Sequence, residues 1–158
     1  MGWFDASEDA LAPETRRAIE NHPAIVYTGF VPDAAPWYRA MDMMVLPTLR
    51  EGFPNAALEA ASSGLPVITT LATGARDAVI PEVTGLQVPP GYPEAICEAI
   101  LQLLSDEPRR RTMGAAARRW AIDRFSEERV MSLTVALYRE LMTADAGVAP
   151  NEAALGVE

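Results

Sequence analysis

The sequence predicts an α/β fold in which helices cover both faces of a parallel sheet. Short segments that are apolar on both faces alternate along the chain with segments of helical periodicity. Strands of this kind are typical of parallel sheets that lie between two layers of helices. The chain has 158 residues, of which 49% are hydrophobic and 22% are charged. It is therefore long enough and apolar enough to form one globular domain with a core.

The first part of the chain begins with a helix and then alternates strands and helices. The expected elements are helices over residues 13–21, 33–41 and 54–63, and strands over residues 24–30, 43–47 and 65–70. Pro13 suits the first position of a helix, and Asp33 can cap the next one. β-Branched and aromatic residues favour the strands, of which the first stops at Gly29 and the second at Pro47. Gly64 is expected to end the third helix.

The second part of the chain carries one more strand and three longer helices. These elements are expected over residues 85–91, 93–105, 108–124 and 126–141. Apolar residues recur at helical spacing in the first of these helices, with Ile96 and Ile100 on one stripe. Ser126 can cap the last helix. The domain is expected to cover residues 1–143, and residues 144–158, which Gly and Pro interrupt, are expected to form a flexible tail.

The composition argues against several classes of function. The formal net charge is −9, which would repel the phosphates of a nucleic acid. Arginines gather within residues 109–124, and we interpret them as a solvated helix face rather than a phosphate or lipid-surface patch. We expect no membrane span and no secretory signal. The lone Cys97 excludes an internal disulfide framework, so we expect a protein of the cytoplasm or of a membrane surface facing it.

The stretch EGFPNAALEAASSG, residues 51–64, follows a predicted strand and therefore lies at the carboxyl end of the sheet, where such folds bind ligands. With Pro54 at the first helical position, Phe53 becomes the N-cap residue. The free N–H groups of the first turn are those of Asn55, Ala56 and Ala57. Together with the positive end of the helix dipole, these groups predict a site for an anion such as a diphosphate.

Two glutamates, Glu51 and Glu59, stand before and inside this helix. Glu59 would lie about 8 Å along the axis from the helix start, so the two carboxylates would contact opposite ends of an extended ligand. Ionised carboxylates only accept hydrogen bonds and therefore suit paired hydroxyls, as on a sugar or a ribose. A nucleotide sugar has this layout. Spacing alone favours an alternative that stays open, in which Glu51 is an ordinary loop residue and Glu59 an exposed helix residue.

The order of these features resembles that of a known family. The runs TGFVPD, AMDMMVLPTLREGFPNAALEAASSGLPVITT and TGARDAVIPEVTGLQVPPG, within residues 24–141, resemble the C-terminal, donor-binding domain of family-4 (group 1) retaining glycosyltransferases. The most specific element is the E-x7-E pair of Glu51 and Glu59. The resemblance implies the Rossmann-like C-terminal half of a GT-B fold. It also implies transfer of a sugar from a nucleotide-sugar donor with retention of configuration, in polysaccharide biosynthesis.

The resemblance gives a role to each matching residue. Glu51 would contact hydroxyls of the donor sugar and is the catalytic candidate, and Glu59 would hold the ribose hydroxyls. The loop and helix start beneath the sugar and diphosphate would be formed by Gly52, Phe53, Pro54 and Asn55. Backbone amides near Ala57 and Leu58 would bind phosphate. The nucleobase would lie near Gly29, Phe30 and Val31. No cofactor and no metal are expected, because the family needs no metal held by an Asp-x-Asp motif and none occurs here.

The resemblance also implies that parts of the enzyme are not in this sequence. Full-length members bind the acceptor with an N-terminal domain that has no counterpart here, and the chain looks truncated at its N-terminus. The family's basic Arg and Lys, which neutralise the diphosphate, are absent too; all 13 basic residues here are arginines. The expected partners are a UDP- or GDP-linked sugar and a missing N-terminal acceptor domain or separate subunit. We expect little or no turnover from this chain alone. The alternatives are a nucleotide-binding or interaction module and an inactive fragment.

The missing part would include the first two strands of the domain, which are central in the family's sheet. Their absence would leave a gap between the strands over residues 24–30 and 43–47, and unpaired central backbone groups are unfavourable. The remaining strands could close up, residues 1–4 could add a strand, or a second chain could fill the gap. We expect a homodimer or a rearranged sheet.

Overall fold

The computed structural model describes residues 11–145 of the chain. The chain divides into two compact units, Met1–Ala40 and Met41–Glu158. The strand considered for residues 1–4 and the predicted tail from residue 146 onward lie outside the described residues.

The first unit contains the helices α1 (Pro13–Asn21) and α2 (Ala35–Arg39). Pro13 stands at the start of α1, as predicted. Asp33 accepts a hydrogen bond from the Ala35 N–H at 3.0 Å, so its carboxylate marks the turn into α2. Both predicted helices of this part are therefore present, although α2 is shorter than expected.

The predicted strand over residues 24–30 is wrong. This run forms no strand, and its apolar side chains face solvent, with Val26 80% exposed. β-Branched and aromatic residues favour a strand only where a neighbour pairs with their backbone and covers their side chains. Among the described residues, no strand pairs with this run.

The second unit is a parallel sheet with flanking helices, as the sequence predicts. Its strands are β1 (Met44–Leu46), β2 (Val67–Thr70) and β3 (Gly85–Val88), and their order in the sheet is β1-β2-β3. Its helices are α3 (Asn55–Ser62), the short 3-10 helix η1 (Ala75–Ala78), α4 (Pro93–Ser105), α5 (Glu107–Phe125) and α6 (Glu127–Asp145). Every element predicted for this part of the chain is present, with small shifts at the ends.

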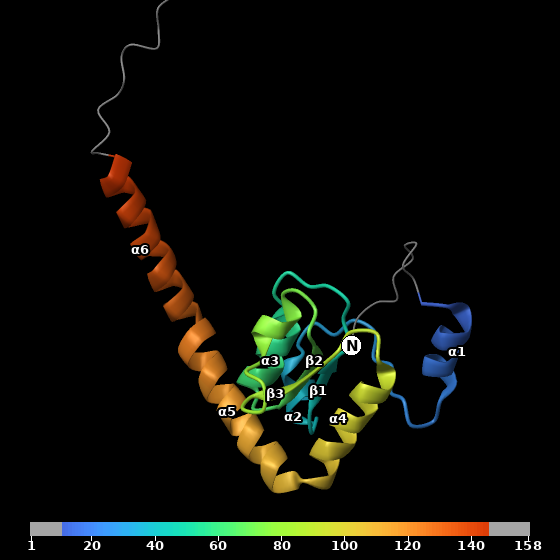
Figure 1. Ribbon diagram of the computed structural model, residues 1–158. Coiled ribbons are helices and arrows are strands. Elements are labelled where there is room, and N and C mark those ends of the chain that lie inside the picture. Colours follow the sequence, from blue (N-terminus) through green and yellow to red (C-terminus); the bar gives the residue numbers. More distant parts are fainter. Residues whose placement is uncertain (1–10, 146–158) are drawn as a thin grey trace, which may run out of the picture. The chain divides into compact units, whose positions relative to one another are not determined.

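Helices α3 and α4 lie on opposite sides of the sheet (Figure 1). In the register of the strands, Val45 pairs with Ile68 and Ile68 with Leu86, so these three side chains share one face. Leu103 of α4 joins that face in the main hydrophobic core, in which Ile68 is fully buried. On the other side α3 buries a row of alanines, Ala57, Ala60 and Ala61. The small side chains let α3 approach closely.

Strand β1 forms an edge of the sheet within the described residues. The Met44 N–H donates to the Pro66 carbonyl oxygen at 3.0 Å. Since backbone groups alternate in direction along a strand, those of Val45 point to the open side. Residues 24–30, predicted to supply the strand that would close up the sheet, form no strand.

Helix α3 ends at Gly64, as predicted, in a Schellman motif. The Leu65 N–H donates to the Ala60 carbonyl oxygen at 3.1 Å, and Gly64 has a φ of +86°. Helix α5 passes this end so closely that a β-carbon at Gly114 would overlap the Gly64 carbonyl oxygen. The absence of a side chain at Gly114 therefore lets the end of α3 and the middle of α5 contact each other through their backbones.

Helix α6 carries the predicted apolar stripe, but its large apolar side chains are exposed. They are Val130, Met131, Leu133, Val135, Leu137, Tyr138, Leu141 and Met142. Within residues 11–145, no helix combines the length and the apolar character that crossing a membrane requires.

Candidate functional site

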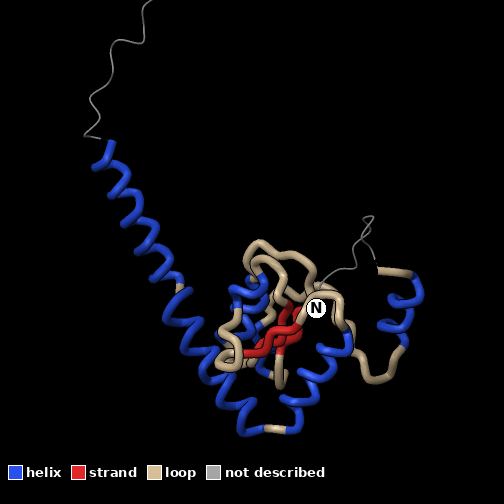
Figure 2. The backbone as a smooth tube through the Cα atoms, in the orientation of Figure 1, coloured by secondary structure: helices blue, strands red, loops and turns tan. Residues whose placement is uncertain are grey.

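The loop after β1 and the loop after β2 lie side by side at the carboxyl ends of the strands (Figure 1, Figure 2). The Glu51 N–H donates to the Thr73 carbonyl oxygen at 3.1 Å. Gly74 follows with a φ of +77°, and a β-carbon there would overlap the carbonyl oxygens of Glu51 and Gly52. The second loop thus fixes the backbone of Glu51 and Gly52 from one side.

Two threonines brace the first loop, and sequence reasoning missed both of them. Thr70 at the end of β2 is buried, and its hydroxyl donates to the Thr48 carbonyl oxygen at 2.5 Å. The Thr48 hydroxyl in turn donates to the Arg50 carbonyl oxygen at 3.0 Å. The signal that could have found Thr70 is that it ends an otherwise apolar strand together with Thr69, because a buried hydroxyl needs a partner.

Helix α3 begins at Asn55, one residue later than predicted, and Pro54 rather than Phe53 is the N-cap residue. Pro54 has a φ of −78° and a ψ of 102°, which is extended backbone. Proline suits the first helical position, but the ψ of Pro54 is extended rather than helical, so the helix begins one residue later.

The first turn of α3 leaves two N–H groups unpaired. The Pro54 carbonyl oxygen accepts the Ala57 N–H at 3.0 Å and the Leu58 N–H at 3.4 Å. Among the described residues, nothing accepts the N–H groups of Asn55 and Ala56. Of the groups predicted to be free, those of Asn55 and Ala56 are therefore left for an anion, whereas Ala57, and Leu58 of the resemblance, donate to Pro54.

The two glutamates of the predicted pair flank this helix start in sequence. Glu51 is half-buried in the loop, and Glu59 is exposed on α3. No hydrogen bond or ion pair to the Glu51 carboxylate comes from the described part of the chain. Glu59 borders a groove of about 250 Å³ between α3 and the end of α5. Its other lining residues are Leu58, Ser62, Ala121, Ile122, Phe125 and Ser126. A ligand can therefore reach both carboxylates from solvent.

Phe53 anchors the loop to α5. Its ring centroid lies 5.2 Å from that of Phe125, with 37° between the ring planes. The Phe125 ring in turn meets Trp120 edge to face, at 5.0 Å. The loop that carries Glu51 is thus held through its backbone by Gly74 and through an aromatic side chain by α5.

The residues predicted near a nucleobase, Gly29, Phe30 and Val31, belong to the first unit. Gly29 has a φ of +63°, and Phe30 is 60% exposed. Because they lie in a separate unit, their role stays a prediction.

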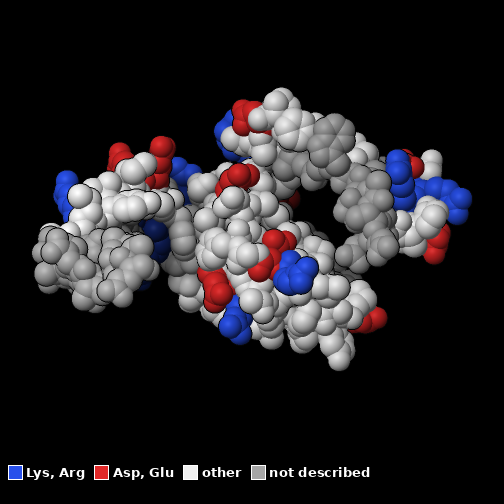
Figure 3. All heavy atoms as spheres, turned by 90° about the horizontal axis from the view of Figure 1, so that it is seen from above, with Lys and Arg blue, Asp and Glu red and all other residues white. Residues whose placement is uncertain are grey.

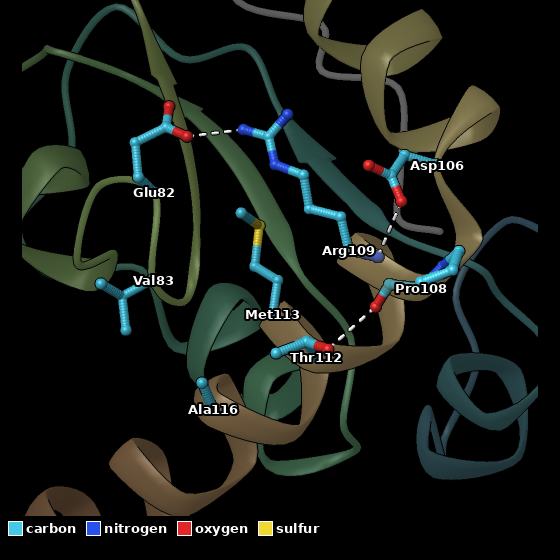
Figure 4. A pocket seen from close by; sticks show the side chains of 8 residues that line it. All are labelled: Glu82, Val83, Asp106, Pro108, Arg109, Thr112, Met113 and Ala116. Carbon is cyan, nitrogen blue, oxygen red and sulfur yellow. Dashed lines mark hydrogen bonds and ion pairs between the residues drawn. The ribbon is translucent and has the colours of Figure 1, made fainter.

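A separate cavity of about 530 Å³ lies beside the turn that precedes β3 and the first turns of α5 (Figure 4). It is lined by Glu82, Val83, Asp106, Pro108, Arg109, Thr112, Met113 and Ala116. Arg109 reaches across it to Glu82 at 2.5 Å, and Asp106 accepts the Arg109 N–H at 2.9 Å. Its charged groups are therefore engaged with one another, and it contains no residue of the predicted site.

Several arginines of α5 form ion pairs inside the unit, and Arg110, with a side chain only 15% exposed, is not part of a solvated face. Their ion pairs are Arg109–Glu82, Arg110–Asp42 and Arg111–Glu107. Figure 3 shows acidic and basic side chains interspersed over one face of the molecule rather than gathered by sign. In the part of the chain that the structure describes, no three His, Cys, Asp or Glu side chains gather as a metal site.

A model of the family described as "Glycosyl transferases group 1" matches residues 5–106. The chain is 35% identical over 141 residues to the capsular polysaccharide biosynthesis glycosyltransferase CapM of Staphylococcus aureus. That match covers 89% of this chain and 37% of CapM. The chain therefore spans less than two fifths of the length of this curated relative.

Solved structures show the same fold. Sucrose-phosphate synthase from Thermosynechococcus elongatus is 32% identical, with a TM-score of 0.77 over 90% of this chain and 37% of that one. Anabaena HepE, solved in complex with UDP, is 25% identical, with a TM-score of 0.70 over 82% of this chain and 34% of that one. The predicted fold class, part of a GT-B fold with a parallel sheet and a helical C-terminus, is confirmed.

Proposed function

Because the chain belongs to the glycosyl transferases group 1 family, we propose that its second unit binds the nucleotide-sugar donor of a retaining glycosyltransferase. The observation that carries this proposal is the start of α3, where the N–H groups of Asn55 and Ala56 are unpaired within the described residues. These groups suit an anion at the positive end of a helix dipole. Glu51 before them and Glu59 after them suit hydroxyls.

In this proposal the donor lies along the carboxyl end of the sheet. Glu51 contacts the sugar hydroxyls and is the catalytic candidate, the amides of Asn55 and Ala56 hold the diphosphate, and Glu59 holds the ribose. UDP is the first nucleotide to test, because the HepE structure contains it, and GDP is the second. The name of CapM supports a polysaccharide as the class of acceptor.

The reaction would be a substitution at the anomeric carbon of the donor sugar. The bond from that carbon to the diphosphate oxygen breaks, a bond to an acceptor hydroxyl oxygen forms, and the proton of that hydroxyl passes to the leaving diphosphate or to solvent. Negative charge then grows on the leaving diphosphate, where fixed N–H groups stabilise it best. The proposal requires neither a metal nor a cofactor.

The acceptor would be bound by a part of the enzyme outside the described residues, either an N-terminal domain or a separate subunit. The open side of β1 supports a partner of this kind, because among the described residues no strand pairs with the backbone groups of Val45. A second copy of this chain is the alternative occupant of that edge. We place the protein in the cytoplasm, whose reducing conditions suit the free, exposed thiol of Cys97.

Calorimetry of the 158-residue chain with UDP, GDP and ADP tests donor binding. We expect UDP to bind and Glu59→Ala to weaken it about tenfold or more, because hydrogen bonds to charged groups contribute about 1.5–3 kcal/mol. Glu98→Ala is the matched control, since it removes an exposed carboxylate from α4, and it should bind UDP as the wild type does. The proposal is wrong if none of the three nucleotides binds.

A second candidate function is nucleotide binding without transfer. The N–H groups at the start of α3 that are unpaired within the described residues would serve nucleotide binding with or without transfer. A transferase assay with UDP-sugars tests the second candidate once binding is established. We expect little or no turnover from this chain alone, and robust transfer would exclude the second candidate.

A further inference from the structure

Phe125 touches both halves of the candidate site. It is the last residue of α5, and its ring stacks at a tilt against Phe53 in the loop that carries Glu51. It also lines the groove that Glu59 borders. These two carboxylates are eight positions apart in the chain, so a shared support from α5 is not a consequence of their sequence spacing.

The loop has few other apolar anchors on that side. Pro54 is buried, whereas Gly52 and Asn55 are exposed, and Phe53 itself is 39% exposed. The backbone contacts of Thr73 and Gly74 reach Glu51 and Gly52 only. The ring contact with Phe125 therefore supports this segment from α5, beside the burial of Pro54.

We propose that Phe125 is a positioning residue for donor binding, which fixes the loop of Glu51 through Phe53 and shapes the groove at Glu59. This inference rests on the proposed function, since it assumes that a nucleotide binds there. Phe125 is not placed in contact with the donor. It acts through Phe53. The Trp120 ring also contacts the Phe125 ring edge to face, with 5.0 Å between the ring centroids.

The test combines UDP affinity with thermal stability for the full chain and five variants. Phe125→Ala should weaken UDP binding about threefold to tenfold, the range expected for one aromatic pair. Phe125→Tyr keeps a ring and should bind UDP as the wild type does. Phe53→Ala should show a similar loss, and the double variant should lose no more than either single one, because both changes break one contact. Tyr138→Ala, which removes an exposed aromatic ring from α6, is the control and should change neither quantity.

The fluorescence of Trp120 gives a second readout that a purely structural role would not move. In wild type, UDP should change the emission through Phe53 and Phe125, and this change should be absent in Trp120→Phe. Phe125→Ala that lowers the melting temperature but leaves UDP affinity unchanged would overturn the inference. If Phe125→Ala does not fold, Phe53→Ala decides in its place, because Phe53 lies in an exposed loop. Failure of the wild type to bind any nucleotide would instead overturn the proposed function and this inference with it.

Discussion

Gly74→Ala should displace the loop that carries Glu51 and destabilise the second unit. Gly74 has a φ of +77° and a ψ of −44°, a region that residues with a β-carbon rarely adopt. A β-carbon would also overlap the carbonyl oxygens of Glu51 and Gly52. These are backbone atoms, so relief requires movement of the loop rather than of a flexible side chain.

The expected magnitude follows from these two effects. Strained backbone of this kind costs about 1–3 kcal/mol, and forcing extra atoms into a packed site costs about 1–3 kcal/mol more. A total near 4 kcal/mol would lower the melting temperature by about 8–16 °C in a chain of this size. UDP affinity should fall as well, because the backbone of Glu51 moves with the loop.

Gly64→Ala is the matched control for Gly74→Ala. Gly64 has a φ of +86°, but a β-carbon there would meet no atom within 4 Å. Only the backbone cost of about 1–2 kcal/mol remains, which would lower the melting temperature by about 2–8 °C. UDP affinity should not change. Circular dichroism melting curves and UDP calorimetry measure both variants. Equal losses of stability and of UDP affinity in Gly74→Ala and Gly64→Ala would refute the close approach of the loops after β1 and β2.

Three further predictions concern other parts of the second unit. The Val45 amide should exchange with solvent deuterons much faster than the Ile68 amide, because β1 is an edge strand and β2 is central; similar protection measured by NMR would place a partner on that edge. A double-mutant cycle of Arg109→Ala and Glu82→Gln in urea should give a coupling below about 1 kcal/mol, because both side chains are substantially exposed; a coupling of several kcal/mol would contradict this. Leu137→Glu on α6 should change stability by less than about 0.5 kcal/mol, because Leu137 is 56% exposed. A large loss measured by thermal melting would reveal a surface that buries it.

The sequence predicted the second unit well because its local and long-range preferences agree. Residues 43–47 and 65–70 are apolar enough to be strands only inside a covered sheet, and the structure provides that sheet. The same argument failed for residues 24–30, which are equally strand-like in composition. Within residues 11–145 they have no neighbouring strand, and composition alone does not reveal whether a neighbour exists.

The sequence named the residues of the candidate site, but it did not predict which amides are unpaired or which residues support the loop. Spacing located Glu51 and Glu59 around a helix start, and the helix start is where it was expected to within one residue. Which amides are left unpaired depends on the ψ of Pro54, which no pattern of residue types specifies. Thr70, Gly74 and Phe125 each lie 22 or more positions away from the loop residue that they support. These supports therefore follow from the fold rather than from the motif.

The backbone contact between Gly64 and Gly114 determines how closely the end of α3 approaches α5. A larger residue at position 114 would push the end of α3 away from α5. A helix of eight residues is stiff over its length of about 12 Å, so its first turn would move too. The distance between the free amides and Glu51 would then change although no residue near a ligand had been replaced. Evolution could therefore adapt this site to donors of different length through a position on the far side of the helix.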